Sequence, residues 1–130
     1  MSLEIERSID IEDAVRIVLQ DYLTVYCRPL PAAFSRPCIL VTQVGGSDSN
    51  KIDNFEVVLD SRADNEAEAL EYLRNAVGIL KASICDSATP IRYVTVNSSG
   101  SWGADPVRPE LAMCSARLTI TAHLENATIE

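Results

Sequence analysis

Residues Pro37–Ala63 read PCILVTQVGGSDSNKIDNFEVVLDSRA, and the rest of the chain is arranged around this stretch. Its first part, Cys38–Val44, is almost entirely apolar and rich in β-favouring residues, which predicts a strand covered on both faces. Gly45 and Gly46 permit positive φ, so we expect the strand to end there. None of the polar residues in the stretch forms a catalytic grouping.

The second part of the stretch predicts a polar loop and another strand. Residues Ser47–Asp53 are polar, and such a loop is longer than a tight hairpin needs. Apolar and polar side chains then alternate from Phe55 to Asp60, which predicts a half-buried strand antiparallel to the first.

Length, composition and charge restrict the possible classes of protein. A chain of 130 residues forms one domain, and 47% hydrophobic against 23% charged residues is a globular composition. No apolar run approaches the ~18–20 residues of a membrane span, and the acidic start MSLEIERSIDIEDAV does not resemble a signal peptide. We therefore expect folding in a cytoplasm. The net charge of −8 argues against sequence-independent nucleic-acid binding, which needs a basic patch.

Two helices are expected on either side of the central stretch. The first begins near Asp10, a good N-cap, and carries an apolar stripe at helical spacing as far as Tyr26. Prolines in RPLPAAFSRP then stop it. The second is capped by Asp64 or Ser61 and carries an apolar stripe that ends at Ile84.

The C-terminal part predicts two more strands. Ile91–Val96 is the third strand, and a long Gly/Ser/Pro loop, Asn97–Pro109, follows it. From Ala112 to Leu124 apolar and polar residues alternate strictly, which predicts a strand with one core face and one polar face. Residues 1–9 are expected to be a flexible arm, residues 10–125 a single domain, and residues 126–130 a frayed tail.

These elements predict an α+β fold in the order α-β-β-α-β-β. Helices and sheet would form a two-layer sandwich, a mainly antiparallel sheet of about four strands packed against two helices.

The search for chemistry yields no catalytic, cofactor or metal site. His123 is the single histidine, without a nucleophile or second ligand near it in the sequence. Gly45–Lys51 lacks the glycine, the hydroxyl residue and the following helix of a phosphate loop. Asp48, Asp53 and Asp60 miss the calcium-loop spacing, and no acid is predicted on an apolar face. We therefore expect a protein that is not an enzyme.

The four cysteines have no paired spacing, so neither a disulfide framework nor a zinc site is predicted. Trp102 lies in the predicted Asn97–Pro109 loop, where an exposed aromatic side chain either folds back onto the domain or contacts a partner. Arg117 lies on the polar face of the last strand.

Element order and two passages carry a resemblance to a known family. "PCILVTQVGG" follows a capped helix and a proline-containing link, and "FEVVLDSRAD" precedes an acidic helix, two strands and a long loop. Over Asp10–Leu124 the chain resembles the tail terminator (tail completion, minor tail) proteins of long-tailed bacteriophages and prophages, the group of the lambda terminator.

The resemblance implies a hexameric ring that ends polymerisation of the tail tube, docks the tail to head–tail connector proteins and lets DNA pass through its lumen. Such a protein is made in the cytoplasm of the bacterial host and becomes part of the virion. We expect Arg117 at a subunit interface or on the lumen face. The expected protein-contact loops contain Ser47, Asp48, Ser49, Asn50, Lys51, Ser101 and Trp102.

Two other readings stay open. The chain is alternatively another head–tail joining or neck protein. It is otherwise a small ligand-binding regulatory α+β domain of the ferredoxin-like kind, although that fold has the order β-α-β-β-α-β, whereas a helix leads here.

Overall fold

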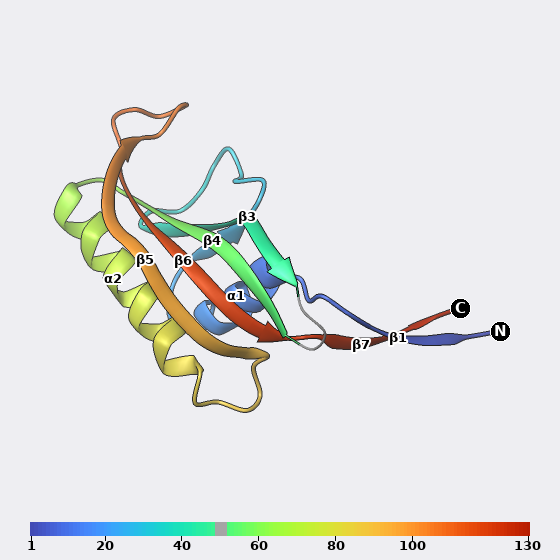
Figure 1. Cartoon of the computed structure of the whole chain (residues 1–130). Coiled ribbons are helices and arrows are strands. Elements are labelled where there is room, and N and C mark those ends of the chain that lie inside the picture. Colours follow the sequence, from blue (N-terminus) through green and yellow to red (C-terminus); the bar gives the residue numbers. More distant parts are fainter. Residues whose placement is uncertain (49–51) are drawn as a thin grey trace.

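A five-stranded sheet with two helices packed on one face forms the body of the protein in a computed structural model, which describes residues 1–48 and 52–130 (Figure 1). The helices are α1 (Ile11–Leu19) and α2 (Glu66–Ser83). The strands are β1 (Leu3–Arg7), β2 (Val25–Cys27), β3 (Cys38–Asp48), β4 (Ile52–Ala63), β5 (Ile91–Ala104), β6 (Ala112–His123) and β7 (Glu125–Ile129).

The strand order in the large sheet is β2-β3-β4-β6-β5, and every pair is antiparallel except β2 and β3. Buried side chains of β3, β4 and β6 meet those of both helices in one core. The alternation in β6 places Cys114, Ala116, Leu118, Ile120 and Ala122 in this core, as the sequence pattern predicts.

Both helices begin with a side-chain cap. Asp10 accepts a hydrogen bond from the Asp13 N–H at 3.2 Å, which confirms its predicted role. Asn65 caps α2 by accepting from the Glu68 N–H at 2.8 Å, so the expected caps Asp64 and Ser61 were wrong.

The predicted sheet of about four strands in the order α-β-β-α-β-β is wrong. Residues 1–48 and 52–130 form seven strands in two sheets, and the first element is a strand. One missed strand is β2, whose residues were assigned to the end of the first helix. That helix ends at Leu19, and β2 then pairs in parallel with the start of β3.

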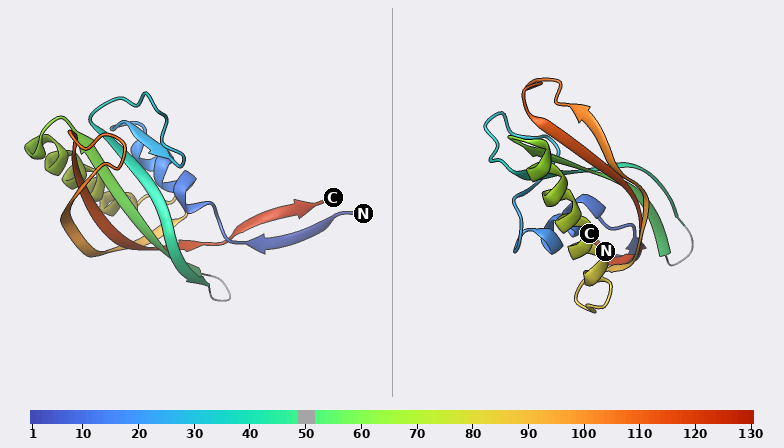
Figure 2. Two further views of the ribbon diagram at one scale, coloured as in Figure 1. Left: turned by 90° about the horizontal axis from the view of Figure 1, so that it is seen from above. Right: turned by 90° about the vertical axis from the view of Figure 1, so that its left-hand side faces the viewer.

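The other missed strands are β1 and β7, which lie in the segments expected to be a flexible arm and a frayed tail. They pair along their whole length as an antiparallel two-stranded ribbon, here called the terminal ribbon. The main contacts of both strands are with each other. The terminal ribbon projects from the body, with both ends of the chain at its tip (Figures 1 and 2).

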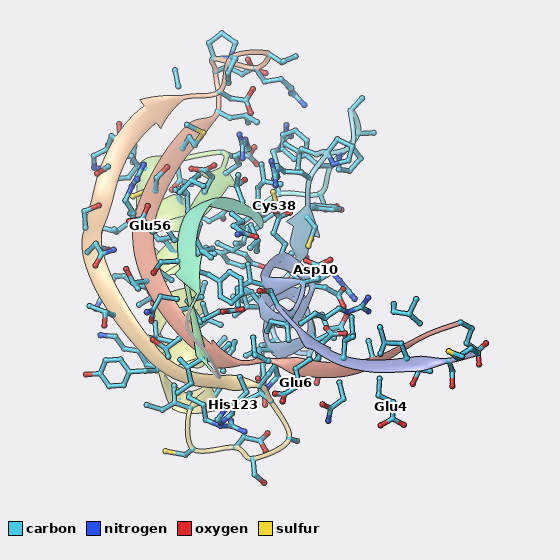
Figure 3. All side chains as sticks on the ribbon, turned by 45° about the vertical axis from the view of Figure 1, so that its right-hand side comes forward. Glu4, Glu6, Asp10, Cys38, Glu56 and His123 are labelled. Carbon is cyan, nitrogen blue, oxygen red and sulfur yellow. The ribbon has the colours of Figure 1, made fainter. Side chains whose placement is uncertain are left out.

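Two expected loops are largely strand. β3 does not end at Gly45 and Gly46 but continues to Asp48, after a register shift between Gln43 and Gly45. Gly46 is required there by close approach, because a Cβ atom would lie 2.7 Å from the Asn54 carbonyl oxygen. β5 likewise extends to Ala104 and is bent together with β6 into an arc (Figure 3).

Candidate interaction surfaces

The sheet face opposite the helices is uncovered and carries a ladder of polar side chains, here called the open face. Thr121 donates a hydrogen bond to Asn54 at 2.7 Å, from β6 to β4. On the other side of β6, the Asn97 amide donates to Thr119 at 2.8 Å. Ser115 also donates to Asp60. These bonds connect β4, β6 and β5 through hydroxyl, amide and carboxylate groups.

Arg117 lies in the middle of the open face, exposed as its alternation in β6 predicts. Its partners in the register are Val58 on β4 and Ser98 on β5, and neither carries charge. Within the parts of the chain that the structure describes, its guanidinium forms no ion pair. The charge of Arg117 is therefore available to a partner.

The predicted contact residues lie at two opposite ends of the sheet. Ser47 and Asp48 are the last residues of β3, and Asp48 pairs with Asp53, which is opposite Ala122 of β6. Ser101 pairs with Ser115 near the start of β6. The two ends are therefore separated by roughly 24 Å at ~3.4 Å per residue of β6. Ser49, Asn50 and Lys51 lie outside the described residues.

Trp102 lies in β5 and not on a loop. It is opposite Cys114, a core residue, so its side chain is on the helix-covered side of the sheet, whereas Ser101 is on the open face. Trp102 is still 49% exposed. An aromatic ring half in contact with the body presents its other half to solvent at this end of the sheet.

Asp53 and Asp105 are buried, which corrects the expectation that no acid lies on an apolar face. Asp53 is 2% exposed, and its Oδ2 accepts a hydrogen bond from the Ser8 hydroxyl at the base of the terminal ribbon. Its Oδ1 is buried without a hydrogen-bond partner among residues 1–48 and 52–130. Alternation in β4 directs Asp53 to the covered side of the sheet. The sequence analysis missed this because it assigned Asp53 to the loop Ser47–Asp53.

The second buried acid, Asp105, joins the end of β5 to β4. Its Oδ2 accepts from the Arg62 Nε at 2.5 Å, and both side chains are buried. Its Oδ1 accepts from the N–H groups of Val107 and Arg108 at 2.8 and 2.9 Å. Burial raises the pKa of Asp105, but the bonds from Arg62 and these amides outweigh it, so the pKa lies below its ordinary value. The Asp-Pro dipeptide is a turn signal that could have located this side chain.

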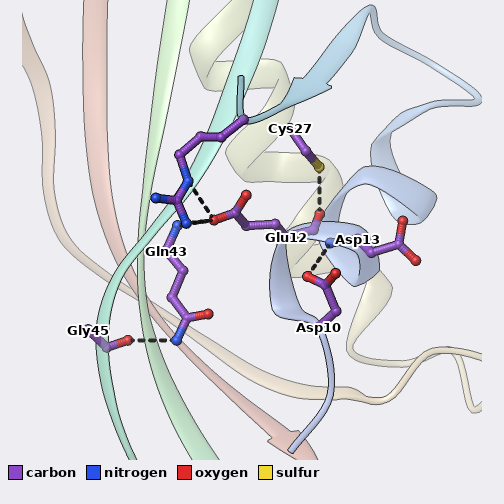
Figure 4. A network of polar contacts seen from close by, with 7 residues as sticks. Asp10, Glu12, Asp13, Cys27, Gln43 and Gly45 are labelled. Atoms are coloured by element: carbon purple, nitrogen blue, oxygen red, sulfur yellow. Dashed lines mark hydrogen bonds and ion pairs between the residues drawn. The ribbon is translucent and has the colours of Figure 1, made fainter. Parts of the chain in front are cut away.

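A third polar network attaches α1 to the edge of the sheet (Figure 4). Glu12 Oε2 accepts from the Gln43 N–H at 2.9 Å and from the Arg28 Nε at 3.0 Å. Burial raises the pKa of Glu12, but the bonds from Arg28 and Gln43 lower it overall. Cys27 completes the network by donating its thiol to the Glu12 carbonyl oxygen at 3.3 Å.

An open groove of about 820 Å³ lies where α1, the turn after α2 and the base of the terminal ribbon meet. We call it the basal groove. Apolar side chains of α1 and α2 line it, among them Ala14, Ile17, Val18 and Ile79. Ile17 is 51% exposed although it belongs to a helix that otherwise packs on the core. No motif of the sequence indicated this groove, because residues from three separate segments build it.

The described parts of the chain contain no cluster of three or more His, Cys, Asp or Glu side chains able to hold a metal ion. His123 is exposed at the end of β6. The four cysteines are free thiols, and burial raises the pKa of Cys38 to about 11. None of the described helices combines the length and the apolar character needed to cross a membrane.

Neither a family model nor a curated protein sequence matches the chain.

Proposed function

We propose that the chain is a structural protein of virion assembly, a tail terminator of a long-tailed phage or prophage. In this proposal it forms a hexameric ring that ends tail-tube polymerisation and joins the tail to the head–tail connector. It catalyses no reaction. It acts in the cytoplasm of the bacterial host during assembly and then in the neck of the virion.

The open face is the observation that carries the proposal. A sheet face of hydroxyl and amide groups, with Arg117 at its centre, lies opposite the face that the two helices cover (Figure 1). Such a face suits a subunit interface or the wall of a channel. The net charge of −8 suits a channel through which DNA passes without being bound, since like charges repel.

The predicted contact residues lie at opposite ends of the sheet, as expected for a protein that joins two different structures. Ser47 and Asp48 lie at one end of the sheet and Ser101 and Trp102 at the other. In a ring whose axis follows the strands, one end would meet the tail tube and the other the connector. Trp102 is the side chain best suited to such a contact, because half-exposed tryptophans often dominate interface energies.

The test is tube growth in the presence of the purified chain. Tail tube protein from the same genome is polymerised with and without the chain, and tube lengths are measured by negative-stain electron microscopy. We expect shorter tubes with a ring at one end, and unchanged growth for tube protein from an unrelated phage. Equal length distributions with and without the folded chain would refute the proposal.

A further inference from the structure

The terminal ribbon has one apolar face and one polar face. Residues directly opposite each other in an antiparallel pair share a face, so the register sorts the ribbon's side chains. Leu3 and Ile129 are 61% and 47% exposed at its tip. The apolar face carries Leu3, Ile5, Ala127 and Ile129, and at the base of the ribbon it ends in the ion pair between Arg7 and Glu125. The other face carries Glu4, Glu6, Asn126 and Thr128.

Within the described parts of the chain, the two strands of the ribbon pack mainly on each other. A two-stranded ribbon alone is marginally stable in water and gains stability when its apolar face packs against another element. It also points away from the body in Figure 1 and in the left view of Figure 2. The apolar face therefore requires a surface that is not its own body.

The basal groove of a second copy of the protein offers such a surface. Its apolar lining includes Ile17, which is half-exposed, and Val18. The five-residue strands of the ribbon extend about 17 Å, and the nine residues of α1 about 14 Å. The ribbon and the groove are thus similar in length, and each leaves apolar side chains uncovered.

The ribbon could enter the groove of its own chain only if the backbone reversed its direction at the base of the ribbon. Ile9, Leu124 and Glu125 line the groove and also connect to the ribbon, which leads away from this point. The bond from Ser8 to the buried Asp53 ties the base to β4. A second copy is therefore the occupant that the geometry favours.

We propose that the terminal ribbon of one copy lies in the basal groove of a second copy, with its apolar face toward Ile17. Glu4 and Glu6 then point to solvent, away from the acids that line the groove, which are Asp10, Asp13, Asp21, Asp86 and Glu125. This contact would be the way in which neighbouring subunits of the proposed ring join. It rests on the proposed function only for the number of copies in the ring.

The free edge of β5 is a poorer receptor for a strand. Its pairing with β6 is interrupted by three register shifts, and Gly100 has a φ of 80°. Such bulges twist an edge and hinder further pairing. The groove therefore explains the uncovered ribbon better than strand addition at β5.

Cysteine cross-linking between two different variants tests the contact. In a Cys85→Ser background, which removes the exposed native thiol, an Ile5→Cys chain is mixed with an Ile17→Cys chain under mild oxidation. We expect a disulfide-linked heterodimer. The matched control replaces Ile5→Cys by Glu4→Cys, on the opposite ribbon face, and should lose the cross-linked band. Equal yields from the two mixtures would overturn the proposal.

A second experiment separates this contact from the proposed function. The Leu3→Asp/Ile5→Asp chain should lose self-association in light scattering while its body keeps the circular dichroism of the parent. The Glu4→Gln/Glu6→Gln chain should still associate. Unchanged rings of the Asp variant would refute the ribbon contact alone. Specific cross-linking of a chain that never stops tube growth would keep the contact and refute the terminator.

Discussion

Arg62 and Asp105 fix the loop after β5 to the end of β4 through a contact between two buried charges. A buried ion pair is not itself strong evidence of stability, because desolvation opposes the attraction between the charges. Removal of one partner, in contrast, is strongly destabilising, because the other charge then stays buried and uncompensated. The Arg62 Nη1 already lacks a hydrogen-bond partner within the described residues.

We therefore expect Asp105→Asn to lower the free energy of unfolding by about 3–5 kcal/mol, as for other broken buried pairs. Urea denaturation followed by circular dichroism measures the change. The matched control is Glu110→Gln, since Glu110 pairs with Arg108 at the surface and exposed ion pairs contribute little to stability. An Arg62→Met/Asp105→Leu double variant should regain part of the loss. Equal effects of the two single substitutions would contradict a special role of the buried pair.

The same pair makes stability depend on pH in a predictable direction. The pKa of Asp105 is lowered on folding from its ordinary value of 3.8. Its contribution is therefore fully present above pH 3.8 and is lost as the pH falls through the folded-state pKa. The difference in unfolding free energy between the parent and Asp105→Asn should thus shrink on acidification below that value. A difference that stays constant down to pH values where the parent unfolds would contradict this linkage.

At the scale of elements, the sequence predicts those parts whose side-chain period is unambiguous. The strict alternation in β6 and the apolar stripe of α2 were interpreted correctly, since each extends over many residues. β2 has three residues and follows a turn that continues the helical spacing of α1, so periodicity alone could not separate it. β1 and β7 contain charged and small residues, and their pairing partner lies at the other end of the chain.

For the same reason, the sequence predicted some features of the surfaces and missed others. The exposed position of Arg117 follows from alternation within one strand, and the structure agrees. Burial of Asp53 and Asp105 depends on contacts with Ser8 and Arg62, which are distant in sequence. The basal groove and the terminal ribbon likewise arise only when separate segments come together. Local patterns therefore identify faces of strands, while long-range contacts create the pockets.

Substitutions at Gly46 and Gly78 test how closely the backbone packs in a strand and in a helix. Gly46→Ala should destabilise the protein by about 1–3 kcal/mol, since the new Cβ would meet the Asn54 carbonyl oxygen of the neighbouring strand. Gly78→Ala, in the middle of α2, meets nothing within 4 Å and should stabilise by about 1 kcal/mol. Thermal unfolding of both variants gives the comparison. A stabilising Gly46→Ala would show that β3 and β4 approach less closely than described.

At the scale of the whole molecule, the net charge of −8 opposes association between copies. Because added salt screens this repulsion, we expect self-association to be stronger in about 1 M than in about 0.1 M NaCl, where the Debye lengths are about 3 and 10 Å. Light scattering at matched protein concentration measures it. The Glu4→Gln/Glu6→Gln chain should depend less on salt. Association that weakens with salt would instead indicate an interface held by opposite charges.

The terminal ribbon brings the first and last residues of the chain together, with Leu3 paired to Ile129. The backbone is thus nearly a closed circle, and a short peptide linker could join its ends without disturbing the body. Head-to-tail cyclisation would reduce the conformational entropy of the unfolded chain and so stabilise the fold. It would also permit circular permutation, with new ends opened at the exposed turn after α2 while the ribbon stays intact.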